Sequence, residues 1–264
     1  MLGLNKYDEN VKNPPSDDSY AMIPVLFAKS NGIGINSLSL TILDLINNGQ
    51  IKCDINLDGS YEVGKKLTHQ DMEVMKRITL RIANKGALKT SETSAINLLK
   101  NMNKAKKFNL KAMAKQSGNA SVANKFEKDF DEFVKALKGE NGYDGENYMD
   151  ILENAKLTGK GKEIKKEWKA FRDYLKSKDL TEKYPPESAE ENSAQVLYGA
   201  CFDIERAALN LRQNNTQLTD FIDKDGYKLL NIIFSNALLN VSKKRKGDGI
   251  FYGVNDKYTI PGGI

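Results

Sequence analysis

The strongest periodic pattern of the chain lies between residues 122 and 137. Apolar side chains recur there at spacings of four, four, three and four, which is the repeat of one buried helix face: Val122, Phe126, Phe130, Phe133 and Leu137. Comparable stripes predict helices at 21–28, 37–47, 68–82, 95–102 and 110–118. Three further stripes predict helices near 164–175, 197–211 and 230–241. The chain is therefore expected to be mainly α.

One short segment has the alternation of a strand instead. Ile51, Cys53 and Ile55 alternate with polar residues, Asp58-Gly59 favours a turn, and residues 61–63 continue the alternation. These features predict a hairpin that follows two helices, which is the order of a winged helix. The glycine-rich segment 139–147 predicts a loop or a second wing.

The predicted fold class is thus mainly α (α+β), with one or two winged-helix domains, small β-hairpin wings and a C-terminal helical part. The expected boundaries are a polar leader at 1–13, a winged helix at 14–67, a helical region with a second winged helix at 68–157, C-terminal helices at 158–243 and a flexible tail at 244–264. The 264 residues suffice for this arrangement.

Composition supports a folded protein of a reducing compartment. The hydrophobic fraction is 40% and the charged fraction 28%, with a mildly basic net charge of +5. Cys53 and Cys201 are far apart in apolar settings, so we expect buried free thiols and no disulfide. The start of the chain lacks the pattern of a signal peptide, and no apolar run has the about 20 residues that a membrane span needs. The chain as given is expected to be soluble.

The sequence contains few residues that could form a catalytic site. His69 is the one histidine and stands in the first turn of a predicted helix, where we expect it to be solvated. There is no cluster at zinc-ligand spacing, no nucleophile elbow and no phosphate-binding loop. Asp223-Lys224-Asp225-Gly226 lacks the remaining ligands of a calcium loop, so a turn is expected. We predict no catalytic residues, no metal and no cofactor.

Four stretches together resemble one family: PPSDDSYAMIPVLF (14–27), LSLTILDLINNGQIKCDI (38–55), LTGKGKEIKKEWKAFRDYL (157–175) and SAQVLYGACFDIERA (193–207). Their order is similar to that in the cytoplasmic region of the YciQ-like predicted membrane proteins, which contain domain of unknown function 2207. In that family a Pro-Pro-x-Asp entry precedes the winged helix, whose second helix carries T-x-x-D-L and a later Gly. A further L-T-x-K-G motif corresponds here to Leu157, Thr158, Lys160 and Gly161.

The resemblance implies a place on the cytoplasmic face of a membrane, with a membrane span and an extracytoplasmic domain upstream. The chain departs from the pattern where family members often carry a hydrophobic hairpin, since it has GYDGENYMDILENAK there. It also has Tyr198-Gly199-Ala200-Cys201 where the family favours a more regular sequence. Because the family has no assigned activity, the resemblance implies location and architecture and no catalytic residues.

Two binding hypotheses follow. In the first, the domain is a non-enzymatic interaction or scaffold domain that presents winged-helix surfaces to a protein. If the domain bound DNA, the helix at 37–48 would be the one that enters the major groove. Its exposed side chains would be Asp44 and five neutral ones: Ser37, Ser39, Thr41, Asn47 and Asn48. The absence of Lys and Arg from this set disfavours phosphate binding. In the second, a membrane-tethered domain binds nucleic acid through basic clusters.

Those clusters are the candidate anionic-surface contacts. They comprise Lys104, Lys106, Lys107, Lys160, Lys162, Lys165 and Lys166. If nucleic acid is the ligand, both clusters should form one continuous positive surface. An anionic membrane surface would suit the same lysines. A third possibility, self-association, requires an exposed apolar stripe on the helix at 226–241, and the sequence itself leaves the oligomeric state open.

Overall fold

A computed structural model describes residues 14–15, 20–27, 33–64, 67–83, 86–143, 146–147, 151–153, 156–177, 189–202, 204 and 216–242. The predicted leader at 1–13 and tail at 244–264 lie outside these ranges. The described part is mainly helical with small antiparallel sheets, as the sequence predicts. The winged-helix assignment itself stays a prediction.

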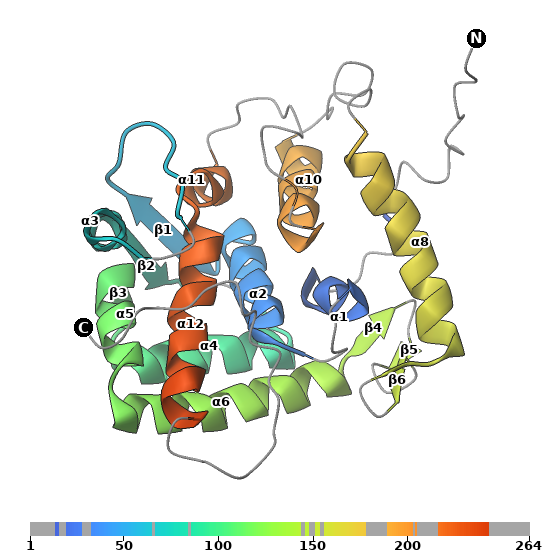
Figure 1. The fold of residues 1–264 in the computed structure, drawn as a ribbon, viewed down its shortest axis with the longest axis horizontal. Coiled ribbons are helices and arrows are strands. Elements are labelled where there is room, and N and C mark those ends of the chain that lie inside the picture. The colour runs from blue at the N-terminus through green and yellow to red at the C-terminus, as the bar shows by residue number, and fades with distance from the viewer. Residues whose placement is uncertain are drawn as a thin grey trace.

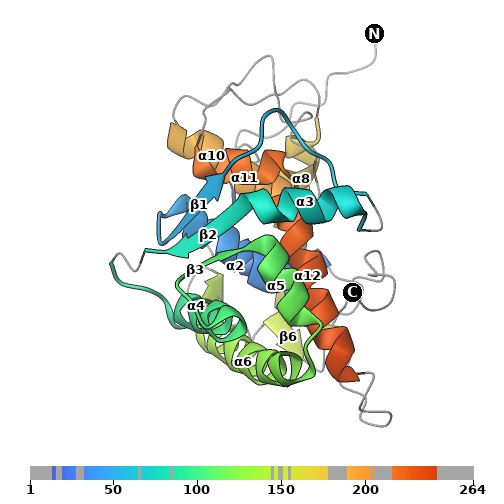
Figure 2. The same ribbon diagram turned by 90° about the vertical axis from the view of Figure 1, so that its left-hand side faces the viewer.

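The first part of the chain builds a helical pair and a small sheet (Figure 1). Its elements in order are η2 (Tyr20–Met22), α1 (Ile23–Phe27), α2 (Ile35–Asn47), β1 (Ile51–Ile55), α3 (His69–Arg77), β2 (Ile78–Ile82), α4 (Thr90–Asn103) and β3 (Lys107–Asn109). The three strands form one antiparallel sheet in the order β1-β2-β3. Figure 2 shows this sheet on one side of the molecule, with α12 on the other.

The second part of the chain adds helices and two short hairpins. Its elements are α5 (Leu110–Ser117), α6 (Ala120–Gly139), β4 (Asn141–Tyr143), β5 (Glu146–Asn147), β6 (Leu152–Glu153), β7 (Lys156–Leu157), α8 (Gly159–Leu175), α10 (Ala189–Phe202), α11 (Gln217–Asp223) and α12 (Gly226–Ser242). β4 pairs with β5 in the segment where the sequence predicts a loop or a second wing, and β6 pairs with β7. The helix at 217–223 was not predicted.

The predicted hairpin after residue 50 is wrong. β1 pairs with β2, with Ile51 opposite Ile82 and Ile55 opposite Ile78, so residues 61–63 are not its partner strand. Residues 56–64 form a connection held by other elements, because the Tyr61 amide donates to the Asp223 carbonyl at 3.0 Å. β1 and β2 pair although the 56–64 connection and α3 separate them in the sequence. No turn motif between the two strands therefore indicates that they pair.

The helix predicted over 68–82 is also too long. α3 ends at Arg77, and residues 78–82 form β2. Ile78 and Ile82 fit a helical spacing of four, but Ile78, Leu80 and Ile82 also alternate, and pairing with β1 decides for the strand. The predicted cap holds: Thr68 and Asp71 form a reciprocal capping box at the start of α3.

The helix α2 lies in the middle of the molecule and contacts η2, β1, α4, α10, α11 and α12 (Figures 1 and 2). Three polar side chains that the winged-helix prediction exposed to DNA are buried: Ser37, Ser39 and Thr41 have exposed fractions of 1%, 0% and 5%. Only Asn47 and Asn48 are exposed, and Asp44 is half-buried. Because other elements cover α2, the expectation that these three side chains are exposed is wrong.

The stripe of α12 is likewise buried. Leu230, Phe234 and Ala237 are fully inaccessible, and the Phe234 ring stacks against Phe126 of α6 at 5.6 Å between ring centroids. The exposed stripe that the self-association hypothesis requires is therefore absent from α12. One hydrophobic core extends from η2 through the sheet to α12.

The L-T-x-K-G motif has a direct structural role at the start of α8. The Thr158 hydroxyl accepts the Gly161 amide hydrogen at 3.0 Å and caps the helix, while the Thr158 amide donates to the Ile151 carbonyl at 3.0 Å. A Cβ at position 161 would lie 2.3 Å from that carbonyl oxygen. The motif thus fixes the junction between α8 and the β6–β7 hairpin. Farther along, α10 ends at Phe202, before the predicted limit; Ile204 lies beyond it, and residues 205–211 lie outside the described residues.

Candidate functional site: a basic face of the sheet

Strand alternation gives the three-stranded sheet one apolar face and one polar face. The apolar face carries Ile51, Cys53, Ile78, Leu80, Ile82 and Phe108, all buried. The opposite face carries Lys52, Asp54, Thr79, Arg81, Lys107 and Asn109, all partly or fully exposed. The apolar face packs on the core, so the polar face is available to solvent.

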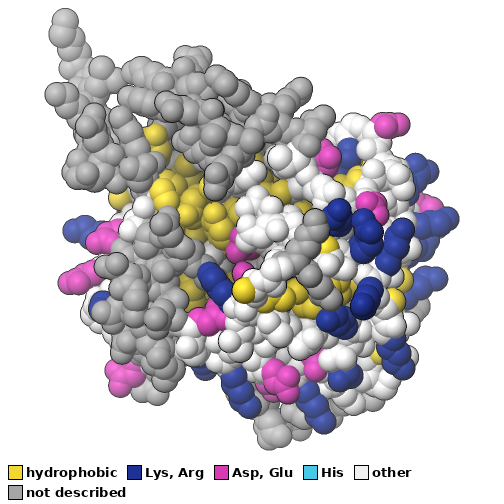
Figure 3. Space-filling model, turned by 180° about the vertical axis from the view of Figure 1, so that it is seen from behind, with side chains coloured by type: hydrophobic (Ala, Val, Ile, Leu, Met, Phe, Trp, Pro, Cys, Tyr) yellow, Lys and Arg dark blue, Asp and Glu magenta, His cyan; other side chains and the backbone are white. Residues whose placement is uncertain are grey.

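The polar face holds three cations in a row. Lys52 on β1 lies directly opposite Arg81 on β2, and Arg81 lies directly opposite Lys107 on β3. Lys104 and Lys106, in the turn between α4 and β3, are exposed beside the same strand. We call these five residues the basic sheet face. Figure 3 shows Lys and Arg side chains gathered on the side of the molecule where the three strands lie.

Within the described part of the chain, no ion pair joins Lys52, Arg81 or Lys107 to a carboxylate. Asp54 is the one carboxylate among the strand residues of this face, and its opposite neighbour is Thr79. Like charges directly opposite one another destabilise a sheet. The arrangement therefore costs stability unless an anion binds to it.

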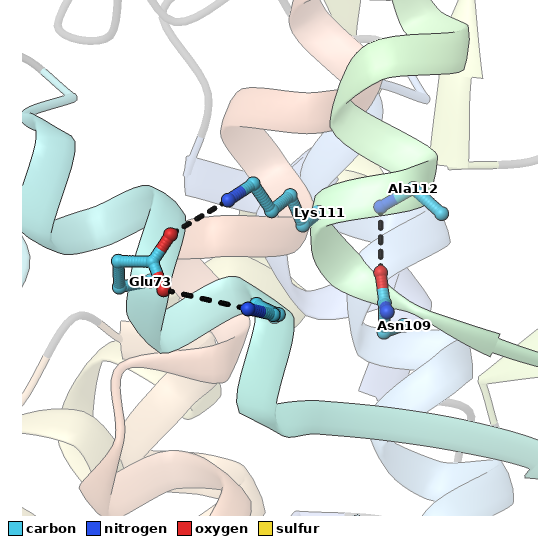
Figure 4. A network of polar contacts seen from close by, with 5 residues as sticks. Glu73, Asn109, Lys111 and Ala112 are labelled. Atoms are coloured by element: carbon cyan, nitrogen blue, oxygen red, sulfur yellow. Dashed lines mark hydrogen bonds and ion pairs between the residues drawn. The ribbon is translucent and has the colours of Figure 1, made fainter.

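Lys111 follows these lysines closely in the sequence but does not belong to the basic sheet face. Its ammonium lies 2.7 Å from the carboxylate of Glu73 on α3, which also lies 3.9 Å from Lys76 (Figure 4). The hydrogen bond from Lys111 lowers the pKa of Glu73. The Asn109 side chain turns toward α5, where it accepts the Ala112 amide hydrogen at 2.7 Å and caps the helix. Lys111 is thus already paired within the protein.

The second predicted cluster is far from the first. Lys160, Lys162 and Lys166 are exposed on α8, which lies on the opposite side of the molecule from β3 (Figure 1). Lys165 is half-buried, with its ammonium 5.5 Å from the centre of the Phe27 ring. The continuous positive surface expected for the nucleic-acid hypothesis is therefore not formed.

Other chemistry-bearing residues have structural surroundings. His69 is exposed in the first turn of α3, as predicted. Cys53 and Cys201 are free thiols, and burial raises the pKa of both. Among the described residues, no group of three or more His, Cys, Asp or Glu side chains is placed to hold a metal ion. An open hollow beside β1 is lined in part by Leu57, Asp58 and Asp223.

The segment 223–226 forms the predicted turn. Asp225 takes a left-handed backbone conformation, with a φ of 52°, and its carboxylate accepts the Val63 amide hydrogen at 2.5 Å. The same carboxylate lies 3.1 Å from the Lys228 ammonium. Burial raises the pKa of Asp225. This carboxylate therefore anchors the 56–64 connection to the start of α12.

The half-buried carboxylate of Asp44 is costly to the fold. Burial raises the pKa of Asp44 on α2 to about 6, and the nearby Glu92 of α4 raises it further, while Lys89 and a 3.1 Å hydrogen bond from Asn48 oppose the shift. Asp44 lies on α2, which contacts both α4 and α10. The charge of Asp44 also raises the pKa of the Cys201 thiol on α10. A half-buried acid beside another acid is a source of pH dependence.

Lys52 and Arg81 are site residues that the sequence did not predict. Both stand alone among apolar and polar neighbours, so neither belongs to a charge run. The available signal was the alternation at 51–55 and at 78–82, which places both on the polar side of a strand. Their meeting depends on the β1–β2 pairing, which the sequence alone does not specify.

Comparison with known proteins assigns the family. No curated protein and no solved structure gives a significant match to the chain. Among the described helices, none is both long enough and apolar enough to cross a membrane. A family model described as the C-terminal domain of a predicted membrane protein (DUF2207) matches residues 7–156, more than half of the 264 residues. The match covers α2, the three-stranded sheet and the basic sheet face, so the chain belongs to the DUF2207 predicted membrane protein family through its C-terminal domain.

Proposed function

We propose that this chain is a non-enzymatic docking domain on the cytoplasmic side of a membrane protein, which binds an anionic partner through the basic sheet face. The observation that carries the proposal is the row of Lys52, Arg81 and Lys107 on adjacent strands, none of which forms an ion pair with a carboxylate among the described residues. Residues that break a local stability rule without an internal compensation are where function is expected.

Of the two expectations from the sequence, the absence of catalysis is kept and the location of the binding surface is changed. The domain is still expected to act without catalysis. The binding surface moves from α2, whose polar side chains are buried, to the sheet. It uses Lys104, Lys106 and Lys107 of the predicted contacts and adds Lys52 and Arg81, while the lysines of α8 form a separate surface.

The test compares two variants of equal net charge on a polyanion column. In the first, Lys52→Gln, Arg81→Gln and Lys107→Gln remove the row. In the second, Lys162→Gln, Lys166→Gln and Lys169→Gln remove three exposed lysines of α8. On heparin-agarose with a sodium chloride gradient, the first variant should elute well before the unmodified chain, because local charge density governs binding to a polyanion.

The α8 variant is the matched control. It should elute close to the unmodified chain, since its substitutions lie away from the sheet. Equal shifts in the two variants would mean that elution follows net charge alone, and the docking function of the sheet would then be rejected. Circular dichroism and thermal unfolding establish that both variants are folded.

A further inference from the structure

We infer that the anionic partner of the basic sheet face is the headgroup surface of a bilayer that contains anionic lipid. This inference rests on the proposed function and names its partner. It makes the sheet an orienting contact, through which the domain lies against the membrane with the polar side of β1, β2 and β3 facing the headgroups.

The geometry of the row suits a flat anionic surface. Neighbouring strands lie about 4.8 Å apart, so the backbones of Lys52 and Lys107, two strands apart, are separated by about 10 Å. That distance is close to the Debye length of about 8 Å at physiological ionic strength, so the three cations act together. Side chains of a sheet stand roughly perpendicular to it. The three charged ends therefore point the same way, toward a surface parallel to the sheet.

The turn between α4 and β3 extends the charged area beyond the strands. Lys104 has a left-handed conformation, with a φ of 50°, which ends α4 sharply and leads the chain into β3. Lys106 follows, and the carbonyl of Lys106 accepts the Ile82 amide hydrogen at 3.0 Å. The turn is thus tied to β2 by its backbone. This bond fixes the place of the two lysines beside the row without using their charges.

The composition of the face favours lipid over other anionic partners. Protein interfaces are anchored by aromatic and aliphatic side chains in their centre. The strand residues of this face are charged or polar, and their apolar neighbours point into the core. Single-stranded nucleic acids are held by aromatic stacking platforms, which these strand residues lack. The major groove of a duplex admits an α-helix or a two-stranded β-ribbon, whereas α2 is buried and the row spans three strands of one sheet.

The family supplies the second reason for lipid. A domain of a predicted membrane protein is held beside a bilayer, so its contact with headgroups is intramolecular in effect. Under that condition a weak electrostatic contact is sufficient to set orientation. The cytoplasmic leaflet carries the anionic lipids that attract such clusters.

The experiment measures binding of the 264-residue chain to vesicles of phosphatidylcholine alone and of phosphatidylcholine with 30% phosphatidylglycerol, by co-sedimentation. Binding is expected to the second composition only, and it should weaken as sodium chloride is raised. The Lys52→Gln, Arg81→Gln, Lys107→Gln variant should lose on the order of 100-fold in partition coefficient, at roughly fivefold for each basic residue near the surface. The α8 variant should retain binding within a few-fold.

Three results would overturn the inference. One is the absence of binding to phosphatidylglycerol vesicles, and another is an equal loss of binding in the α8 variant. The third is tight binding to a generic DNA duplex that depends on the row, with no vesicle binding, which would assign the face to nucleic acid. If the row governs elution from heparin but vesicles are not bound, the docking function stands and only the choice of lipid fails.

Discussion

The hydroxyl of Tyr61 donates a 2.6 Å hydrogen bond to Asp71, the same carboxylate that closes the capping box of α3 with Thr68. Asp71 is buried, with an exposed fraction of 2%. The bond joins the connection at 56–64 to the helix that follows it. It explains how this connection is ordered although it does not pair with β1.

Removing this hydroxyl should destabilise the protein. We expect Tyr61→Phe to lower the free energy of unfolding by about 1–2 kcal/mol, because the buried Asp71 carboxylate loses one of its donors. Urea unfolding measures the change. A double-mutant cycle with Asp71→Asn should show coupling between the two residues, and additive effects would contradict the assigned bond.

Two buried serines should respond to alanine with opposite signs. Among the described residues, the Ser39 hydroxyl of α2 finds no hydrogen-bond partner, whereas the Ser117 hydroxyl donates to the Ala114 carbonyl at 2.7 Å and accepts from Asn236 at 2.7 Å. Ser39→Ala should therefore stabilise the protein by up to about 1 kcal/mol, and Ser117→Ala should destabilise it by about 1–2 kcal/mol. Thermal unfolding of the two variants measures both changes. If both substitutions destabilise the protein, the Ser39 hydroxyl has a hydrogen-bond partner in solution.

The glycines of the L-T-x-K-G motif should differ sharply. A Cβ at position 161 meets the Ile151 carbonyl oxygen, so Gly161→Ala should cost about 1–3 kcal/mol as the α8 junction is forced apart. A Cβ at position 159 meets nothing within 4 Å. Gly159→Ala is thus the matched control, and it should be neutral or slightly stabilising. Equal effects of the two substitutions in chemical denaturation would refute the close approach at 161.

These local features show what the sequence predicts well. The stripe of α6, the capping box at Thr68 and the end of α5 at Gly118 depend on residues within a few positions of each other, and all were predicted. The strand β2 was assigned to a helix because Ile78 and Ile82 satisfy both periods, and only pairing with β1 distinguishes them.

The same distinction explains the site. Lys104, Lys106 and Lys107 were predicted as a cluster because they are neighbours in the sequence. Lys52 and Arg81 join them only through two non-local strand pairings. The burial of α2 was missed for a related reason: the Ser and Thr side chains resemble a solvated face, and the helices that cover α2 come from distant parts of the chain.

The half-buried Asp44 should make stability depend on pH. Its folded-state pKa of about 6 lies above the ordinary value of 3.8, mainly because of burial and secondly because of Glu92. The stability that the neutral acid provides is complete below about pH 4 and is lost as pH rises through about 6. Asp44→Asn should thus raise the free energy of unfolding at pH 7 by at most about 3 kcal/mol, with little gain near pH 4.

Unfolding of this variant and the unmodified chain between pH 4 and pH 8 provides the measurement. Asp58→Asn, at an exposed carboxylate of the 56–64 connection, controls for the removal of one negative charge. A gain that does not change with pH would exclude ionisation of Asp44 as its cause.

Replacing Arg81, the central cation of the row, should raise the stability of the protein and weaken its binding to vesicles. Arg81 lies opposite Lys52 on one side and Lys107 on the other, so Arg81→Gln relieves two like-charge pairs. We expect it to raise the free energy of unfolding by about 0.5–1 kcal/mol at low ionic strength. The gain should shrink in high salt, because exposed charges are screened. The same variant should bind phosphatidylglycerol vesicles several-fold more weakly. A gain in stability together with a loss of binding is expected when a charged residue serves a partner and not the fold. If the variant loses both stability and binding, Arg81 supports the fold, and the row loses its main support as a docking surface.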